Sequence, residues 1–278
     1  MEIINKDKKA ITTITSNINL LEYVRKCLHY KELIWALVKK DLKVKYAQTR
    51  LGLFLSILQP VISLLIFSLF FGKLLHLGSD GTPYPVFVFI GLISWYYFSI
   101  LVVISGTSLI ESQQIIKKVY FPKLIIPVSK AISALMEFFI WLLVLVVLMV
   151  IYKITPSYKI LFFPVFLILN MVAGLTIGIW LSALSFKRRD FIHVVPYFVG
   201  LTMMVTPVFY HVTIIPQNIN YLLYFNPIAG IVQGFRWCIT GNETFSLWYI
   251  PSFLIMFLFF FLSVWYFKKV EYRMAEQL

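Results

Sequence analysis

The sequence predicts an all-α integral membrane protein with six transmembrane helices, and three observations support this fold class. First, 60% of the 278 residues are hydrophobic and only 13% are charged. A water-soluble domain with that balance would leave large apolar surfaces exposed. Second, several apolar stretches reach the length of about 20 residues that a membrane span needs. Third, the basic residues flank these stretches instead of forming the single patch that a nucleic-acid-binding protein would show.

The first 50 residues precede any long apolar stretch. We expect residues 1–29 to form a polar cytoplasmic tail. From Leu33 to Lys45, apolar residues recur at helical spacing and alternate with lysines. This pattern is typical of an amphipathic helix that lies in the headgroup plane at the inner interface. Residues 1–50 are therefore assigned to a cytoplasmic tail and an interface helix.

Six apolar runs follow, and we expect each to be a membrane-spanning helix. They occupy residues 51–73, 86–110, 127–152, 160–185, 191–212 and 247–267. Prolines interrupt several runs, which membrane helices tolerate where neighbouring helices satisfy the freed backbone groups. Residues 51–278 therefore form a six-helix transmembrane domain.

The distribution of lysine and arginine orients these helices. With six spans and a cytoplasmic N-terminus, four of the 25 basic residues fall outside, which leaves 21 inside. The segment 213–246 is apolar enough for a seventh span, but a seventh crossing would move the basic C-terminal tail outside. We therefore interpret 213–246 as a re-entrant helical hairpin entered from the outer face, and place both termini in the cytoplasm.

The first candidate functional element is the loop at 111–126, between the second and third predicted spans. Its first part reads ESQQIIKKVYFPK, which predicts a short amphipathic helix that ends before Pro122. A membrane protein driven by a soluble motor needs a rigid cytoplasmic element for the motor to push. On these residues alone, an ordinary basic loop is an equally good interpretation.

The second candidate is the aromatic cluster Trp95-Tyr96-Tyr97-Phe98. It begins about ten residues into its predicted span, roughly 15 Å deep at 1.5 Å per residue, which is too deep for an interfacial aromatic belt. A tyrosine hydroxyl at that depth needs a polar partner, supplied by another helix or by water in a pore. Pore-lining rings suit sugars, whose C–H faces pack on aromatic rings. Helix–helix packing explains the cluster equally well.

Two charged residues lie at membrane depth. Glu137 is inside the third predicted span, where a charge is costly and suggests a function. Lys130 lies two helical turns earlier on the same face, so structural pairing of these two residues is the favoured interpretation. Arg236, in the hairpin, contacts an anionic group in transit or anchors the hairpin at the outer phosphates, and the anchor is slightly favoured.

Several residue patterns are missing from the sequence. No GxxxxGK[ST] phosphate-binding loop occurs, because Gly72-Lys73 is followed by Leu74 and has no glycine five residues earlier. We therefore expect a protein that is not an enzyme and binds no cofactor itself, so that any ATP is hydrolysed by a separate subunit. The histidines show no metal-binding spacing, and Cys27 and Cys238 are interpreted as structural thiols on opposite sides of the membrane.

The order and spacing of several short motifs resemble those of ABC-2-type polysaccharide, O-antigen and teichoic acid export permeases, the transmembrane subunits of ABC transporters. The resemblance covers about residues 30–275. One departure is Phe54-Leu55, where the family often carries tryptophan after the Leu-Gly pair. The motifs are LVKKDLKVKY at 37–46, Leu51-Gly52, Gln59-Pro60, IKKVYFPK at 116–123 with Pro127, TPVFY at 206–210, Ile215-Pro216, FNPI at 225–228, and Arg236.

The resemblance implies a homodimer in the cytoplasmic (inner) membrane that binds two copies of a separate ABC ATPase, which holds ATP and Mg²⁺. The cargo would be a polyprenyl-diphosphate-linked glycan such as O antigen, capsule or a teichoic acid precursor. It would pass through a dimer-interface channel walled partly by the first, second and fifth spans.

The resemblance also implies roles for particular residues. The residues that couple to the ATPase would be Gln114, Lys117, Lys118, Tyr120, Phe121 and Pro122. The residues that line the channel would be Tyr46, Trp95, Tyr96, Tyr97, Phe98, Tyr197, Phe209 and Tyr210. The outer gate would include Asn226, Pro227 and Arg236.

Other functions remain open at this point. A small-molecule or lipid efflux permease of the same superfamily would need an apolar, laterally open pocket instead of a long wet channel. A membrane enzyme acting on polyprenyl-linked sugars would need clustered carboxylates or histidines, whereas Glu111, Glu137 and Asp190 are scattered. A secondary transporter is weakly supported, since there is one buried carboxylate and no obvious internal repeat.

Overall fold

The computed structural model describes residues 20–47, 52–75, 78 and 81–277, and every regular element within those ranges is a helix. Five helices there are long and apolar enough to cross a membrane. They are α3 (Gly52–Phe67) with η2 (Ser68–Leu74), α4 (Tyr84–Glu111), α6 (Ile125–Ile151), η3 (Tyr158–Phe162) with α7 (Phe163–Lys187), and η6 (Leu247–Tyr249) with α11 (Ile250–Gln277). The all-α class is confirmed, and five of the six predicted apolar runs are helices of spanning length.

The remaining run differs from the prediction. The helix expected at 191–212 is α8 (Phe191–Val205), which is apolar but shorter than the other five. It ends because Thr206 has an extended backbone (φ −90°, ψ 135°) and is followed by Pro207. A residue before proline is driven away from the helical conformation, and proline has no N–H to continue the ladder.

Helix α4 is the centre of the bundle: 72% of the residues in its apolar 18-residue stretch are buried. It packs most closely on α7, because small residues there let the two backbones approach. A Cβ added at Gly178 would lie 2.6 Å from the Ser105 Cβ. Asn170 of α7 also donates a 2.9 Å hydrogen bond to the Ser94 carbonyl of α4. These two helices form the rigid core on which the other elements pack.

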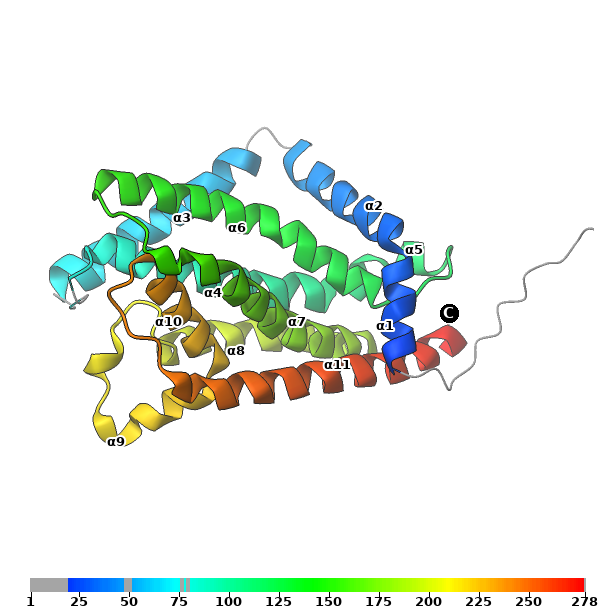
Figure 1. Cartoon of the computed structure of the whole chain (residues 1–278). Helices are drawn as coiled ribbons and strands as arrows, with labels where there is room; N and C mark the ends of the chain where they lie inside the picture. The colour runs from blue at the N-terminus through cyan, green and yellow to red at the C-terminus, as the bar shows by residue number, and fades with distance from the viewer. Residues whose placement is uncertain (1–19, 48–51, 76–77, 79–80, 278) are drawn as a thin grey trace, which may run out of the picture.

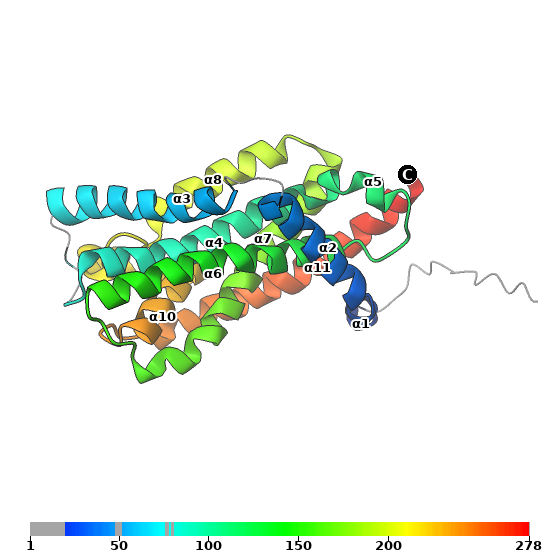
Figure 2. The same cartoon turned by 90° about the horizontal axis from the view of Figure 1, so that it is seen from above.

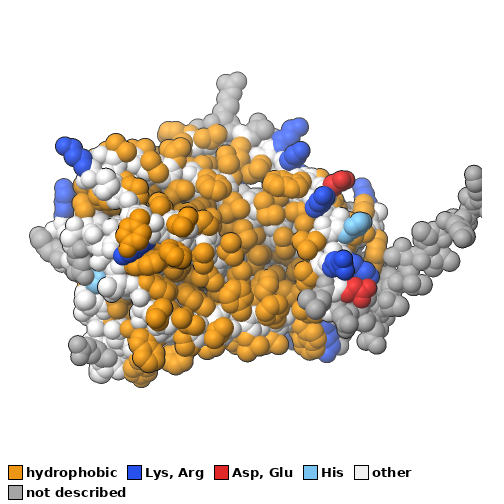
Figure 3. Space-filling view, viewed as in Figure 1, with side chains coloured by type: hydrophobic (Ala, Val, Ile, Leu, Met, Phe, Trp, Pro, Cys, Tyr) orange, Lys and Arg blue, Asp and Glu red, His pale blue; other side chains and the backbone are white. Residues whose placement is uncertain are grey.

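Helix α3 with η2 is the opposite case, because only 11% of the residues in its apolar stretch are buried. Figure 2 shows it along one side of the bundle, and its leucine, isoleucine and phenylalanine side chains are largely exposed. A broad apolar band covers the face drawn in Figure 3, and charged side chains gather mainly toward the end that carries α1 and the C-terminus. We call this the basic end.

The N-terminal region corrects one expectation. Residues 20–29, predicted as part of a polar tail, form α1 (Leu20–His29), while residues 1–19 lie outside the described part. Helix α1 lies across the end of α11 (Figure 1), and two of its own side chains, Tyr23 and Cys27, are buried. The Tyr23 hydroxyl donates a hydrogen bond to Glu271 of α11. The tail prediction was wrong here because the partner of α1 is more than 200 residues away in sequence.

The helix expected from Leu33 to Lys45 is present as α2 (Lys31–Leu42), continued by a π-helical turn, η1 (Lys43–Ala47). Leu37 and Val38 are buried, and α2 packs on α6. Lys39 and Lys40 are exposed. The alternation of apolar residues and lysines therefore gives a helix with one packed face and one basic face.

The loop at 111–126 contains one short helix, α5 (Gln113–Ile116). The segment at 213–246 begins within η4 (Val212–Ile214). It continues as α9 (Gln217–Asn220), η5 (Tyr221–Phe225) and α10 (Pro227–Ile239). Helix α10 packs against α4 and α7, so this segment is anchored to the core. Both cysteines are unpaired and buried, as expected of structural thiols.

Docking of α1 makes a testable prediction about Cys27. Burial and the nearby Glu271 raise the pKa of the Cys27 thiol to about 12. The thiolate is the nucleophile, and its fraction near pH 8 is therefore very small. The test protein carries Cys238→Ser, so that Cys27 is its one thiol. The comparison protein carries Cys27→Ser, Cys238→Ser and Leu28→Cys, which places its one thiol at an exposed position. Cys27 should react with a maleimide at least about tenfold more slowly than the cysteine at position 28. Equal labelling rates would show that α1 is not docked.

Candidate functional site

The loop at 111–126 exposes its middle and is held at its end. Backbone hydrogen bonds continue the turn of α5 as far as Val119. Gln114, Lys117, Lys118 and Tyr120 are exposed, whereas Phe121 is buried and Pro122 is half-buried. The predicted helix is therefore present but short, and Lys117, Lys118 and Tyr120 after it face outward.

The end of this loop is attached to α11. The backbone N–H of Lys123 donates a 2.8 Å hydrogen bond to Glu271, the same carboxylate that accepts from Tyr23. The Lys123 side chain is buried, and burial lowers the pKa of its ammonium group although Glu271 opposes this shift. Glu271 thus joins α1, the loop and the C-terminal helix at the basic end.

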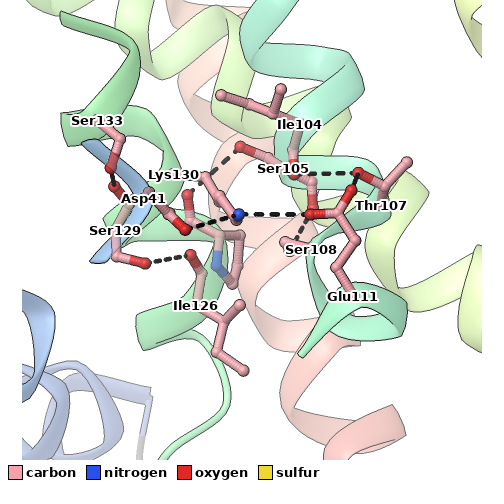
Figure 4. A network of polar contacts seen from close by, with 11 residues as sticks. Asp41, Ile104, Ser105, Thr107, Ser108, Glu111, Ile126, Ser129, Lys130 and Ser133 are labelled. Carbon is pink, nitrogen blue, oxygen red and sulfur yellow. Dashed lines mark hydrogen bonds and ion pairs between the residues drawn. The ribbon is translucent and has the colours of Figure 1, made fainter. Parts of the chain in front are cut away.

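Lys130 of α6 lies between two carboxylates, one of which is Glu111 at the beginning of the loop (Figure 4). Its Nζ is 3.2 Å from Asp41 Oδ1 of α2 and 3.3 Å from Glu111 Oε2 at the end of α4. The other Glu111 oxygen accepts a 2.7 Å hydrogen bond from Thr107. The predicted pairing of Lys130 with Glu137 is therefore wrong. Seven residues of helix separate the two side chains by about 10 Å, and closer carboxylates are supplied by α2 and α4.

Glu137 is paired with a different lysine. It forms an ion pair with Lys45 of η1, and its second oxygen accepts a 2.7 Å hydrogen bond from the Tyr96 hydroxyl. Tyr96 also contacts Gln59 of α3 at 3.3 Å and stacks on Trp141 with the ring centroids 4.1 Å apart. The buried carboxylate therefore has partners on two other elements, which offsets the cost of placing its charge at this depth.

The aromatic cluster divides into two groups. Trp95, Tyr97 and Phe98 are buried in the core of the single chain. Tyr97 contacts Phe138 edge-on at 5.2 Å. These three side chains are almost inaccessible to a solute, which agrees with helix–helix packing as the explanation of the cluster. Tyr96 is only partly buried.

The other channel candidates do not form one group. Tyr46 is partly buried beside Lys45, close to Glu137 and Tyr96. Tyr197 on α8 is 67% exposed. Phe209 is buried against Phe71, with centroids 4.6 Å apart. The Tyr210 hydroxyl donates to the Val205 carbonyl at 3.0 Å and so covers the end of α8.

Arg236 is an interior residue of this structure, with 1% of its surface exposed. Its Nη2 donates a 2.6 Å hydrogen bond to the Val208 carbonyl, and its guanidinium lies 3.6 Å from the centre of the Phe87 ring. Its Nε is 3.9 Å from Glu243 Oε1. The anchor at the outer phosphates is therefore wrong, because these partners neutralise the cation inside the protein.

The segment around Arg236 is tightly built. A Cβ at Gly91 would lie 2.2 Å from the Val208 carbonyl oxygen, so only glycine allows this approach of α4 to the turn after α8. Asn226 caps α10 by accepting from the Ile228 N–H at 3.0 Å, and it donates to Thr206 at 3.0 Å. Pro227 is the first residue of α10, where a missing N–H is harmless.

Sequence reasoning missed the partners of these charges. Asp41 and Lys45 lie within the motif at 37–46, and Glu111 opens the loop at 111–126, but their pairing depends on how α2 and α4 pack on α6. The only signal in the sequence was the presence of acidic residues within otherwise basic segments. Arg236 and Glu243 are seven residues apart in one segment, so their proximity could have been anticipated.

A cavity of about 600 Å³ lies between α7, α8, α11 and the start of α10. Its lining is almost entirely apolar. The hydroxyls of its two polar residues, Thr176 and Ser252, donate to carbonyls of their own helices at 2.7 Å. The cavity therefore suits a hydrocarbon and has no hydroxyl donor directed to a sugar.

Comparison with known proteins adds independent information. A family model described as ABC-2 type transporter matches residues 32–240. The O-antigen export system permease protein RfbA of Klebsiella pneumoniae is 29% identical over 249 residues, which cover 88% of this chain and 94% of that protein. RfbA of Myxococcus xanthus is 26% identical over 219 residues, covering 78% and 84%. The polysialic acid transport protein KpsM of Escherichia coli is 26% identical over 245 residues, covering 84% and 93%.

The matched region begins in α2 and ends just after α10. It therefore includes the loop at 111–126, the ion pairs of Lys45 and Lys130, and Arg236, and it ends before Glu243. The expected resemblance is confirmed, and the chain belongs to the ABC-2 type transporter family, as a multi-pass membrane permease.

Proposed function

We propose that the protein is the membrane subunit of an ATP-driven exporter that moves a polyprenyl-diphosphate-linked polysaccharide across the inner membrane. It acts as a homodimer with two copies of a separate ATPase. The observation that carries the proposal is the loop at 111–126, which presents exposed basic and aromatic side chains at the basic end while its base is tied to α4, α6 and α11. The names of the relatives, which refer to O-antigen export and polysialic acid transport, support the cargo class.

The proposed topology has six crossings, with α8 as the short fifth span and both termini in the cytoplasm. Fifteen residues of helix reach about 22 Å, so α8 needs the following turn at Thr206–Tyr210 to complete its crossing. The segment 213–246 then enters and leaves from the outer face, with α10 packed on α4 and α7. Most residues of α10 are buried in the protein, which is the condition for a re-entrant segment at membrane depth.

The proposed channel lies between two copies of the chain. Helices α3 and α8 have the faces least covered by their own chain, and α8 presents Tyr197 there. Because Trp95, Tyr97 and Phe98 are interior, the wall is assigned to the more accessible tyrosines 46, 96, 197 and 210. A wet aromatic wall removes the cost of several kcal/mol for each sugar hydroxyl that would otherwise lack a partner in hydrocarbon.

Lipid or small-molecule efflux is the second candidate function, and the apolar cavity between α7, α8 and α11 favours it. A cavity with an almost entirely apolar lining would hold a hydrocarbon tail better than a glycan. Transport assays in proteoliposomes with the partner ATPase separate the two candidates. ATP-dependent movement of a labelled lipid lacking sugar, without movement of a lipid-linked oligosaccharide, would replace the polysaccharide proposal.

The ATPase proposal makes a prediction for the protein alone. Purified without a partner, it should hydrolyse no ATP above the background of a mock preparation, because it has no phosphate-binding loop. Hydrolysis should be restored by adding the ATPase subunit. Robust hydrolysis by the isolated chain would contradict the permease assignment.

The coupling role predicts the effect of charge reversal in the loop. Lys117→Glu/Lys118→Glu should weaken binding of the ATPase subunit at least about tenfold, because both lysines are exposed at the proposed contact. The matched control Lys39→Glu/Lys40→Glu makes the same charge change on the exposed face of α2 and should leave the Kd within about twofold. The Kd is measured by titration in detergent. Equal weakening by both variants would indicate a general charge effect.

The channel role predicts the effect of removing an exposed ring. Tyr197→Ala should slow oligosaccharide export about threefold or more without lowering folded yield, because the side chain packs little within its own chain. Tyr158→Ala removes an even more exposed tyrosine, in η3, and should not change the rate. Export is measured in proteoliposomes with the partner ATPase. A Tyr197→Ala rate equal to wild type would remove α8 from the channel wall.

A further inference from the structure

One ammonium group joins the base of the coupling loop (residues 111–126) to the interface helix. Lys130, in the first turns of α6, contacts Asp41 of α2 at 3.2 Å and Glu111 at 3.3 Å. Glu111 is the last residue of α4, and Ser112 separates it from α5. Figure 4 shows Lys130 Nζ between the two carboxylates. A displacement of α5 therefore changes the position of one of the two anions that share this cation.

The two contacts are not equivalent. The Lys130 and Asp41 side chains are 17% and 23% exposed, whereas Glu111 is 54% exposed. Water and salt screen the Glu111 contact more strongly, so it is the weaker and more easily broken of the two. One cation cannot fully neutralise two carboxylates. Withdrawal of Glu111 would strengthen the Lys130–Asp41 pair, and its approach would weaken it.

A second ion pair, between α6 and the π-helical turn η1 that continues α2, provides a contrast. Lys45 of η1 binds Glu137 of α6, with the order of charges reversed relative to Asp41 and Lys130. The other Glu137 oxygen accepts from Tyr96, in the middle of α4. This pair does not involve the coupling loop. Among the described residues, ion pairs of Asp41 and Lys45 thus link α2 and η1 to α6, and the pair at Lys130 is the one shared with the loop.

We propose that Lys130 is a positioning residue for transport, which transmits displacement of the coupling loop to α2 by redistributing its ion pair between Glu111 and Asp41. The inference rests on the proposed function, because it assumes that an ATPase moves the loop. Its role is distinct from that of Lys117 and Lys118, which are exposed at the proposed docking surface and lack this connection to α2.

The test uses the full-length protein with its ATPase subunit in proteoliposomes. It measures ATPase binding, ATP hydrolysis and export of a fluorescent polyprenyl-diphosphate oligosaccharide. Lys130→Gln should leave the Kd for the ATPase within about twofold but reduce the oligosaccharide exported per ATP at least about fivefold. Glu111→Gln, at an exposed position that tolerates substitution, should change the same ratio in the same direction. Lys40→Gln, on the exposed face of α2, should not change it.

Charge exchange separates positioning from simple structural support. Asp41→Lys/Lys130→Asp restores the α2–α6 pair but places two carboxylates, at 111 and 130, opposite each other. This double variant should recover folded yield and not the export ratio. Adding Glu111→Lys restores both contacts and should recover the ratio.

Two results would overturn the inference while the proposed function stands. One is an unchanged export ratio in Lys130→Gln and Glu111→Gln, with any loss confined to folded yield. The other is full recovery of the ratio by the double exchange, which would show that Glu111 takes no part. By contrast, a wild-type protein that exports no oligosaccharide with its ATPase would contradict the proposed function itself.

Discussion

A charge inside a low-dielectric bundle costs several kcal/mol unless a partner is built beside it, and this constraint governs the architecture outside the α4–α7 core. Glu137 is paired with Lys45, Lys130 with Asp41 and Glu111, and Arg236 lies close to Glu243. In the first two cases the partner comes from the amphipathic segment, so pairing also fixes where α2 and η1 dock. In the third it fixes the segment after α8. The peripheral elements are therefore placed by electrostatics, while the core helices are placed by close packing of small residues.

The sequence predicted the helices well because the length and hydropathy of an apolar run are local properties. It failed where the outcome depended on packing. Residues 20–29 form a helix because Tyr23 meets Glu271, a contact that no local pattern contains. Lys130 was assigned to Glu137 because the two share a helical face, yet the nearest carboxylates come from other helices. Helix α8 ends before the apolar run does, because Pro207 drives Thr206 out of the helical conformation although the residues that follow are still apolar.

The aromatic cluster illustrates a limit specific to membrane proteins. In a soluble helix, periodic hydrophobicity separates the buried face from the exposed one, but in lipid both faces are apolar. The sequence of α4 does not indicate that this helix is central. The membrane depth of its aromatic cluster is therefore predictable from the sequence, but the residues that surround the cluster are not. The structure buries Trp95, Tyr97 and Phe98 and leaves Tyr96 beside Glu137. Whether a ring faces a channel thus depends on helix arrangement, which single-sequence patterns do not contain.

The weak attachment of α3 gives the charge pairs at α2 their mechanical importance. Helix α3 follows η1 after a short connection, and little of its surface is buried by its own chain. Its polar contact from Gln59 to Tyr96 joins the same group that includes Glu137 and Lys45. A shift of α2 therefore reaches α3 both along the chain and through this group, whereas the tightly packed α4 and α7 resist displacement. In the proposed exporter, a helix that its own chain restrains little follows, in the sequence, the segment that the coupling loop moves. Rearrangement of the channel wall then requires little disruption of the core.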